Sequence, residues 1–225
     1  MLLRRVIPLL VISVIHFLSS SAQSYRYQLE TFGTRNGMLS SKVYALFQAG
    51  DRRLWIGTES GISVYDGYRF INYQYTTANE SIGRILCITQ DKEKGLWIGG
   101  DKGLFYCSND SVRKIELQSG IILAVESLLT DEDGNIWAGD INALYQITAE
   151  QANRVYFNQA AIIDLQPHGS FNKRVFALAA DSKQNIYAGS YDGIFRIKKN
   201  GGAYENIWTN PEPRNPVRLL CSYLV

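Results

Sequence analysis

Leu54-Trp55-Ile56-Gly57-Thr58 is the stretch of this 225-residue chain that decides its fold, because the same pattern returns three more times. The later copies are Leu96-Trp97-Ile98-Gly99-Gly100, Ile136-Trp137-Ala138-Gly139-Asp140 and Ile186-Tyr187-Ala188-Gly189-Ser190. The aromatic residues of successive copies are 42, 40 and 50 residues apart. Self-similarity at such a period indicates a repeat architecture in which each repeat is one structural unit.

Each copy lies between further short apolar segments, which together make a unit of four strands. An apolar strand is expected before each copy, at 43–48, 85–90, 125–130 and 175–180. Another is expected after it, at 61–65, 103–106, 143–147 and 193–197, and a more variable fourth strand follows, as at 70–75. Gly61, Gly103 and Gly193 permit the positive φ of a tight turn, and Asn142, which tolerates a left-handed conformation, takes that place in the third unit.

Four-stranded units at a period of about 40–45 residues predict the blades of a β-propeller. A single sheet with two apolar faces cannot bury itself, whereas radial stacking lets each blade cover its neighbour. We therefore predict an all-β fold of about four antiparallel blades with partial flanking strands, forming an incomplete propeller. Trp55, Trp97 and Trp137 are predicted to pack between blades. The blades are expected at approximately 38–80, 81–120, 121–165 and 171–212, with a partial blade at 216–225.

The N-terminus has the pattern of a secretory signal peptide. Arg4 and Arg5 precede an almost wholly apolar stretch at 6–18, and small residues follow it. Ser20 and Ala22 would stand at positions −3 and −1 of a cleavage site before Gln23. A spanning helix needs roughly 20 residues, more than this stretch provides, which disfavours the alternative of an uncleaved anchor. We expect residues 1–22 to be removed and residues 23–225 to be periplasmic.

The residues around the first copy resemble the two-component regulator propeller repeat family. The resemblance rests on 54–58, on Gly61-Ile62, on Tyr65-Asp66-Gly67 with Phe70, and on the approach segment at 36–43. Such repeats are similar to the periplasmic sensor region of hybrid two-component histidine kinases, in which the propeller precedes a further β-domain, a membrane helix and the kinase. The resemblance implies an extracytoplasmic sensor whose ligands are glycans or other nutrients.

The chain is short for such a regulator. Residues 23–225 hold fewer than five units, and 217–223 resembles the first strand of a unit that does not continue. The expectation is an N-terminal fragment, with the membrane helix and kinase beyond Val225. The remainder of a sensor kinase or a second propeller copy is the expected protein partner. The alternative is a free-standing secreted propeller scaffold that binds a glycan or a protein.

Few residues are available for catalysis or metal binding. The sequence has 2 His and 3 Cys, and His168 lacks the helical pattern that a phospho-accepting histidine needs. Asp131-x-Asp133-Gly134 has its glycine too early for a calcium loop and aligns with the turns of the other units, so a hairpin turn is predicted. No nucleophile elbow, zinc-protease motif or phosphate loop occurs in the sequence. We therefore expect no enzyme, no metal and no other cofactor.

The cysteines are expected to be free, buried apolar fillers. Cys87 and Cys107 would lie on strands two apart, about 9–10 Å from each other, which is too far for a disulfide. Cys221 follows in the partial blade.

Charge excludes nucleic acid as a partner and marks one candidate site. The 23 Lys+Arg and 21 Asp+Glu become equal once the two arginines of the signal peptide are removed, and nucleic-acid binding rests on excess basic charge. Basic residues nevertheless recur just before the first strands, and the third unit has Ala124 there. These residues are Lys42, Arg84, Arg174 and Arg218.

The first strand of a propeller blade is the innermost, so these basic residues are predicted to ring one mouth of the channel. That mouth would be opposite the turns between first and second strands. Fixed like charges focus a field in a cleft, which predicts an anionic ligand such as an acidic glycan. The alternative is that these are solvated loop residues repeated by duplication.

Overall fold

The structure, a computed structural model, describes residues 29–117, 124–157, 162–163, 172–197, 203–212 and 214–217. The chain divides into two compact units, Met1–Thr31 and Phe32–Val225, and all the helices and strands described below belong to the second. The predicted signal peptide, His168, Arg218 and Cys221 lie outside the described residues. Within those residues, no helix has the length and apolar character that crossing a membrane requires.

Antiparallel sheets with strands in chain order carry the fold. The first sheet contains β1 (Val43–Gln48), β2 (Leu54–Thr58), β3 (Gly61–Tyr65) and β4 (Phe70–Tyr73). The second contains β5 (Ile85–Gln90), β6 (Leu96–Gly100), β7 (Gly103–Ser108) and β8 (Ser111–Leu117), with the short strand β12 (Ile162–Ile163) parallel to β8. The third contains β9 (Ser127–Thr130), β10 (Ile136–Gly139) and β11 (Leu144–Ile147). The fourth contains β13 (Ala177–Ala180), β14 (Ile186–Gly189), β15 (Gly193–Ile197) and β16 (Tyr204–Thr209).

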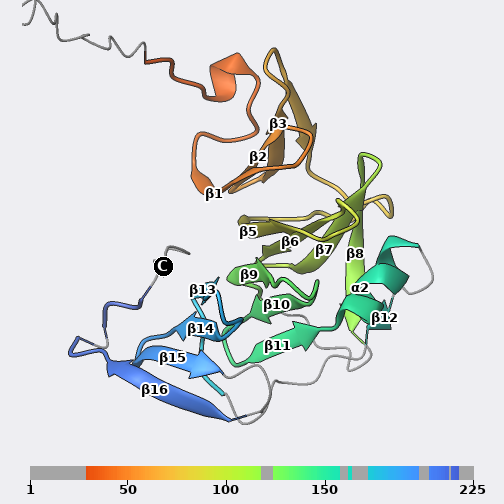
Figure 1. The fold of residues 1–225 in the computed structure, drawn as a ribbon. Helices are drawn as coiled ribbons and strands as arrows, with labels where there is room; N and C mark the ends of the chain where they lie inside the picture. The colour runs from red at the N-terminus through yellow and green to blue at the C-terminus, as the bar shows by residue number, and fades with distance from the viewer. Residues whose placement is uncertain are drawn as a thin grey trace, which may run out of the picture. The chain divides into compact units, whose positions relative to one another are not determined.

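The sheets follow one another in sequence order, as propeller blades do. The first strands β1, β5, β9 and β13 contact each other in that order. In Figure 1 the first and fourth sheets stand at opposite ends of this series, and the sheets do not close into a ring within the described residues. The predicted all-β fold of successive, unclosed propeller blades is confirmed.

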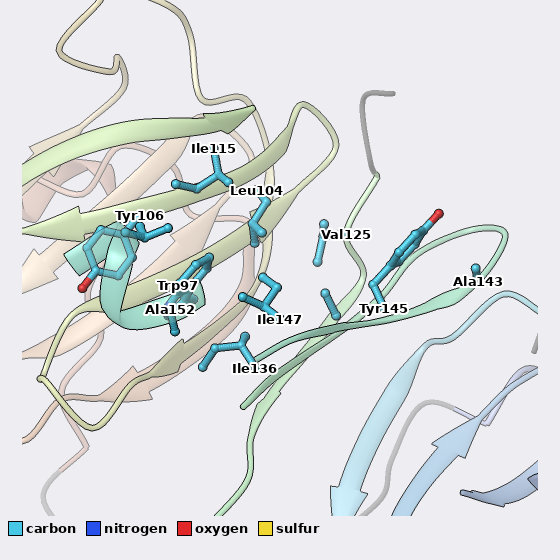
Figure 2. Packing of buried hydrophobic residues seen from close by; sticks show 12 residues of the cluster. Trp97, Leu104, Tyr106, Ile115, Val125, Ile136, Ala143, Tyr145, Ile147 and Ala152 are labelled. Carbon is cyan, nitrogen blue, oxygen red and sulfur yellow. The ribbon is translucent and has the colours of Figure 1, made fainter. Parts of the chain in front are cut away.

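The aligned tryptophans pack between blades, as predicted. Trp55 joins Ile85 and Phe105 of the second blade in one buried cluster, and Trp97 joins Ile136 of the third blade in another. Trp137 lies with residues of the fourth blade in a third cluster. Figure 2 shows the Trp97 cluster, in which side chains of the second and third blades face each other. Burying such aromatic surface is the main source of stability between the blades.

A glycine in each second strand sets how closely the next blade approaches. A Cβ atom on Gly99 would lie 2.6 Å from Cγ1 of Val125, and one on Gly139 would lie 2.5 Å from Cβ of Val175. Gly57 has the same relation to Ile85, and Gly189 has it to Val217. These glycine contacts define which residues are equivalent in successive blades, without reference to where each strand begins. They make Val217 the equivalent of Val125 and Val175.

Aspartates link the first turn of most blades to the aromatic residue of the repeat. Asp91 accepts hydrogen bonds from the backbone N–H of Gly95 (2.7 Å), from Trp97 Nε1 (3.1 Å) and from the Tyr106 hydroxyl (3.0 Å). Asp131 accepts a hydrogen bond from Trp137 Nε1 at 2.9 Å. Asp181 accepts one from the Tyr187 hydroxyl at 2.9 Å. The predicted hairpin turn at Asp131 is therefore confirmed. The Asp131 carboxylate accepts hydrogen bonds both from the turn and from Trp137.

The first blade lacks this link. Ala49 stands where the other blades have aspartate, six residues before the aromatic residue. Trp55 Nε1 is buried and has no hydrogen-bond partner. A buried, unsatisfied donor costs about 1–3 kcal/mol, so the first blade carries a local defect that the others do not.

The third unit departs from the predicted four strands. Its sheet has three strands among the described residues, and the chain then enters helix α2 (Ala149–Tyr156). Thr148 and Gln151 cap this helix reciprocally, since each side chain accepts a hydrogen bond from the other's backbone N–H. Arg113 of β8 donates a hydrogen bond to the carbonyl of Val155, so the helix is fixed to the second blade.

The turn before β11 also differs from expectation. Asn142 does not have the predicted left-handed conformation. The Asp140 carboxylate instead accepts hydrogen bonds from the backbone N–H groups of Asn142 and Ala143, each at 2.7 Å. The other units have glycine with positive φ at this turn, for example 132° at Gly103. In the third unit, hydrogen bonds to the Asp140 carboxylate thus take the place of a glycine with positive φ.

Cys87 and Cys107 are free, and strand β6 lies between their strands. Cys107 is buried, whereas Cys87 is partly buried beside the third blade. Burial raises the pKa of both thiols, that of Cys107 to about 12. Neither thiol is therefore a reactive thiolate at neutral pH.

Candidate functional site

A pocket of about 270 Å³ opens where the innermost strands begin. Equivalent positions of the four blades line it, and in the second to fourth blades this position comes one residue after the residue that packs on the preceding blade's glycine. The lining residues are Tyr44, Leu86, Glu126 and Phe176. The backbone N–H groups of Glu126 and Phe176 bond to the carbonyls of Gly139 and Gly189, at 2.8 and 2.9 Å, which continues the strand pairing up to the pocket. The repeat thus brings residues from four distant segments to one place.

Three of the basic residues predicted from the sequence lie within the described residues, and each of the three has an acidic partner. Lys42 Nζ lies 2.9 Å from Glu59 Oε1, and an Arg84 guanidinium nitrogen lies 3.5 Å from Asp101 Oδ2. Arg174 Nε lies 2.9 Å from Glu126 Oε2, and a second nitrogen of this guanidinium binds Oε1. Charge at the described part of the rim is therefore balanced pair by pair rather than uniformly basic.

Two of these bases also stack on the aromatic residues of the pocket. The Arg84 guanidinium carbon lies 5.7 Å from the ring centroid of Tyr44, which belongs to the preceding blade. The corresponding atom of Arg174 lies 4.9 Å from the ring centroid of Phe176. Cation–π contacts of this kind are worth about 0.5–1 kcal/mol at exposed sites. They hold both guanidinium groups next to the pocket lining.

The ion pairs also shift the protonation equilibria of two bases. The hydrogen bond that Arg174 donates to Glu126 raises the pKa of Arg174 above its ordinary value. The hydrogen bond to Glu59 likewise raises the pKa of Lys42. Both groups are therefore cationic at neutral pH.

Arg218 does not share the register of the other predicted site residues. Val217 packs against Gly189 as Val175 packs against Gly139, and its backbone N–H bonds to the carbonyl of Ser190 at 3.2 Å. The residue immediately before the first strand is therefore Pro216. Arg218 corresponds in sequence to the pocket-lining position, and its own placement lies outside the described residues.

Sequence reasoning missed the pocket lining itself. Its four residues share a position in the repeat but not a residue type, whereas the recurring bases stand two residues earlier. The ion pair between Glu126 and Arg174 joins residues 48 positions apart. Among the described residues, no cluster of histidine, cysteine or acidic residues suited to a metal ion is present.

Part of the first blade matches the model of a known protein family. Residues 37–60 match the model described as "Two component regulator propeller". This stretch of the chain is therefore similar to one such propeller repeat. The matched stretch contains β1, β2 and the pocket residue Tyr44. It also contains Lys42 and Glu59, one of the ion pairs at the rim.

Solved structures show the same fold. The extracellular domain of a hybrid two-component system from B. thetaiotaomicron is 22% identical with a TM-score of 0.60, over 76% of this chain and 22% of that one. Virginiamycin B lyase from Staphylococcus aureus is 14% identical with a TM-score of 0.58, over 75% of this chain and 56% of that one. The WD40 domain of Neurospora crassa Pan2 is 16% identical with a TM-score of 0.54, over 75% and 50%. No curated protein matches this propeller-repeat chain.

Proposed function

We propose that these blades are the extracytoplasmic, ligand-sensing propeller of a two-component signal transduction regulator. The match of residues 37–60 to the two component regulator propeller model carries this proposal. The fold likeness to the extracellular domain of a hybrid two-component system supports it, although this chain spans only 22% of that structure. The blades are a non-catalytic binding module in this proposal, and the likeness to a lyase concerns the fold alone.

The ligand is proposed to enter the pocket between the innermost strands. The rings of Tyr44 and Phe176 offer flat apolar faces, and aromatic faces of this kind stack on the apolar face of a sugar ring. Arg84 and Arg174 hold guanidinium groups beside those rings. Guanidinium groups bind carboxylate and sulfate oxygens in bidentate fashion. An acidic glycan, or another small acidic nutrient, satisfies both features.

A binding measurement on the exported chain tests this proposal. We would titrate the protein by calorimetry with oligogalacturonate and with the uncharged oligosaccharide of the same length. We expect only the acidic ligand to bind, with an affinity that falls as salt concentration rises. Arg84→Ala should weaken this binding at least tenfold. The matched control is Arg69→Ala, which removes an exposed arginine paired with Asp66 in the β3–β4 turn.

Equal binding of both oligosaccharides would contradict the acidic ligand while keeping a glycan sensor. Equal losses in the Arg84 and Arg69 variants would contradict the proposed pocket. The absence of binding by any acidic or neutral glycan would count against glycan sensing by these blades.

A further inference from the structure

The pair between Arg174 and Glu126 differs from the other ion pairs of the rim. It joins the third and fourth blades through two hydrogen bonds, in which both carboxylate oxygens of Glu126 accept from nitrogens of the Arg174 guanidinium. The Glu126 side chain is 14% exposed, against 44% for Glu59 and 39% for Asp101. Bidentate, partly buried pairs are considerably stronger than exposed single contacts.

One partner of this pair lines the pocket, and the other lies beside a second lining residue. Glu126 lines the pocket, and Arg174 lies over the ring of Phe176, which also lines it. The guanidinium that is best placed to hold an acidic ligand group is therefore already occupied by a carboxylate of the protein. A ligand carboxylate has the same charge and fork geometry as the glutamate side chain.

We propose that Glu126 is an internal competitor for the acidic group of the ligand. This inference rests on the proposed function, because it concerns the same pocket. In the free protein Glu126 holds Arg174. An acidic ligand binds when its carboxylate replaces that of Glu126, and the released glutamate then stands beside a like charge, which disfavours the complex.

Competition of this kind regulates affinity and selects ligands. Part of the interaction energy of each ligand is consumed in breaking the existing pair, so a weakly acidic or neutral compound does not open it. The exchange also releases the link between the third and fourth blades. Ligand binding is thereby coupled to the contact between two blades, as an effector is coupled to a second site.

The test compares Glu126→Gln with the unchanged chain, using glucuronate as the acidic probe and glucose as its uncharged counterpart. The substitution keeps the shape of the side chain and removes its charge. We expect glucuronate to bind about tenfold more tightly, within the range usual for coupling between sites, and the response to glucose to stay the same. Glu59→Gln is the matched control, because it frees Lys42 outside the pocket lining.

The outcomes separate this inference from the proposed function. Glucuronate that binds the unchanged chain as tightly as the Glu126→Gln protein, or more tightly, overturns the competitor and leaves the acidic-ligand sensor standing. Glucuronate that binds neither protein overturns both. If Glu126→Gln does not fold, Glu126→Asp is used instead, because it keeps the charge on a side chain that is too short to pair fully with Arg174. An affinity for glucuronate that does not rise in the Glu126→Asp protein overturns the competitor as well.

Discussion

Ala49→Asp should repair the one blade that lacks an acceptor for its tryptophan. Asp91 shows what the new carboxylate would do, since it accepts hydrogen bonds from Trp97 Nε1 and from a backbone N–H of the turn. Trp55 Nε1 is buried without a partner, and pairing it recovers about 1–3 kcal/mol. Placing a carboxylate at a position that is only 5% exposed offsets part of this gain.

The Arg53 guanidinium, 5.5 Å from the Trp55 ring centroid, is already paired with Asp51 and Asp110, so the gain rests on the hydrogen bond to Trp55. We therefore expect a net gain of about 1 kcal/mol in the free energy of unfolding. For a chain of this size the corresponding rise in Tm is roughly 2–4 °C. Urea unfolding followed by circular dichroism measures the free energy without depending on tryptophan emission.

Trp55→Phe supplies the control, because it removes the orphan donor and keeps an aromatic ring. In a double-mutant cycle, Ala49→Asp should lose its gain when Trp55 is replaced, which gives a coupling energy of about 1 kcal/mol. A gain that survives in the Trp55→Phe background would refute the reasoning. Destabilisation by Ala49→Asp alone would show that desolvation of the carboxylate outweighs the hydrogen bond.

Three further outcomes are expected. Trp97→Ala should lower the free energy of unfolding by about 3–5 kcal/mol, since it empties a fully buried aromatic site, and chemical denaturation checks this. Gly99→Ala should destabilise by about 1–3 kcal/mol or more, because the new methyl group meets Val125 at 2.6 Å, and the change in Tm reports it. Carboxyl titration by NMR should place the pKa of Asp91 above its ordinary value, because burial there outweighs its hydrogen bonds. The pKa of Asp181 should be lowered, because hydrogen bonds from Asn185 and Tyr187 outweigh the opposing effect of burial.

These opposite shifts have opposite consequences for stability. The contribution of Asp91 is fully present below its unfolded pKa and is lost as the pH rises through its raised folded value. The contribution of Asp181 is present above its unfolded pKa and is lost as the pH falls through its lowered folded value. Removing each carboxyl group in turn, by Asp91→Asn and Asp181→Asn, should therefore alter different limbs of the stability profile.

The sequence predicts most of the blades because strand, turn and tryptophan recur in register, and each recurrence repeats the same packing problem. It fails in the third unit, where Thr148 and Gln151 give a capping box that favours a helix over a fourth strand. It also misses Glu126, since pairing with a residue 48 positions away follows from how blades stack and not from any local pattern. Arg218 stands two residues after Pro216, the position that corresponds to Arg84 and Arg174, because the recurrence of a basic residue does not by itself fix the register.

The blades share the close contact at the glycine of each second strand, whereas the residue that lines the pocket differs from blade to blade. Each of these joints consists of a glycine and an apolar residue at or just before the start of the next inner strand, as with Gly99 and Val125. The pocket is lined by one residue of each blade, and this residue is tyrosine, leucine, glutamate or phenylalanine in the four blades. Blades with such joints are interchangeable modules. Duplication or exchange of whole blades, or substitution at the pocket position, would alter what the protein recognises without redesigning how it folds.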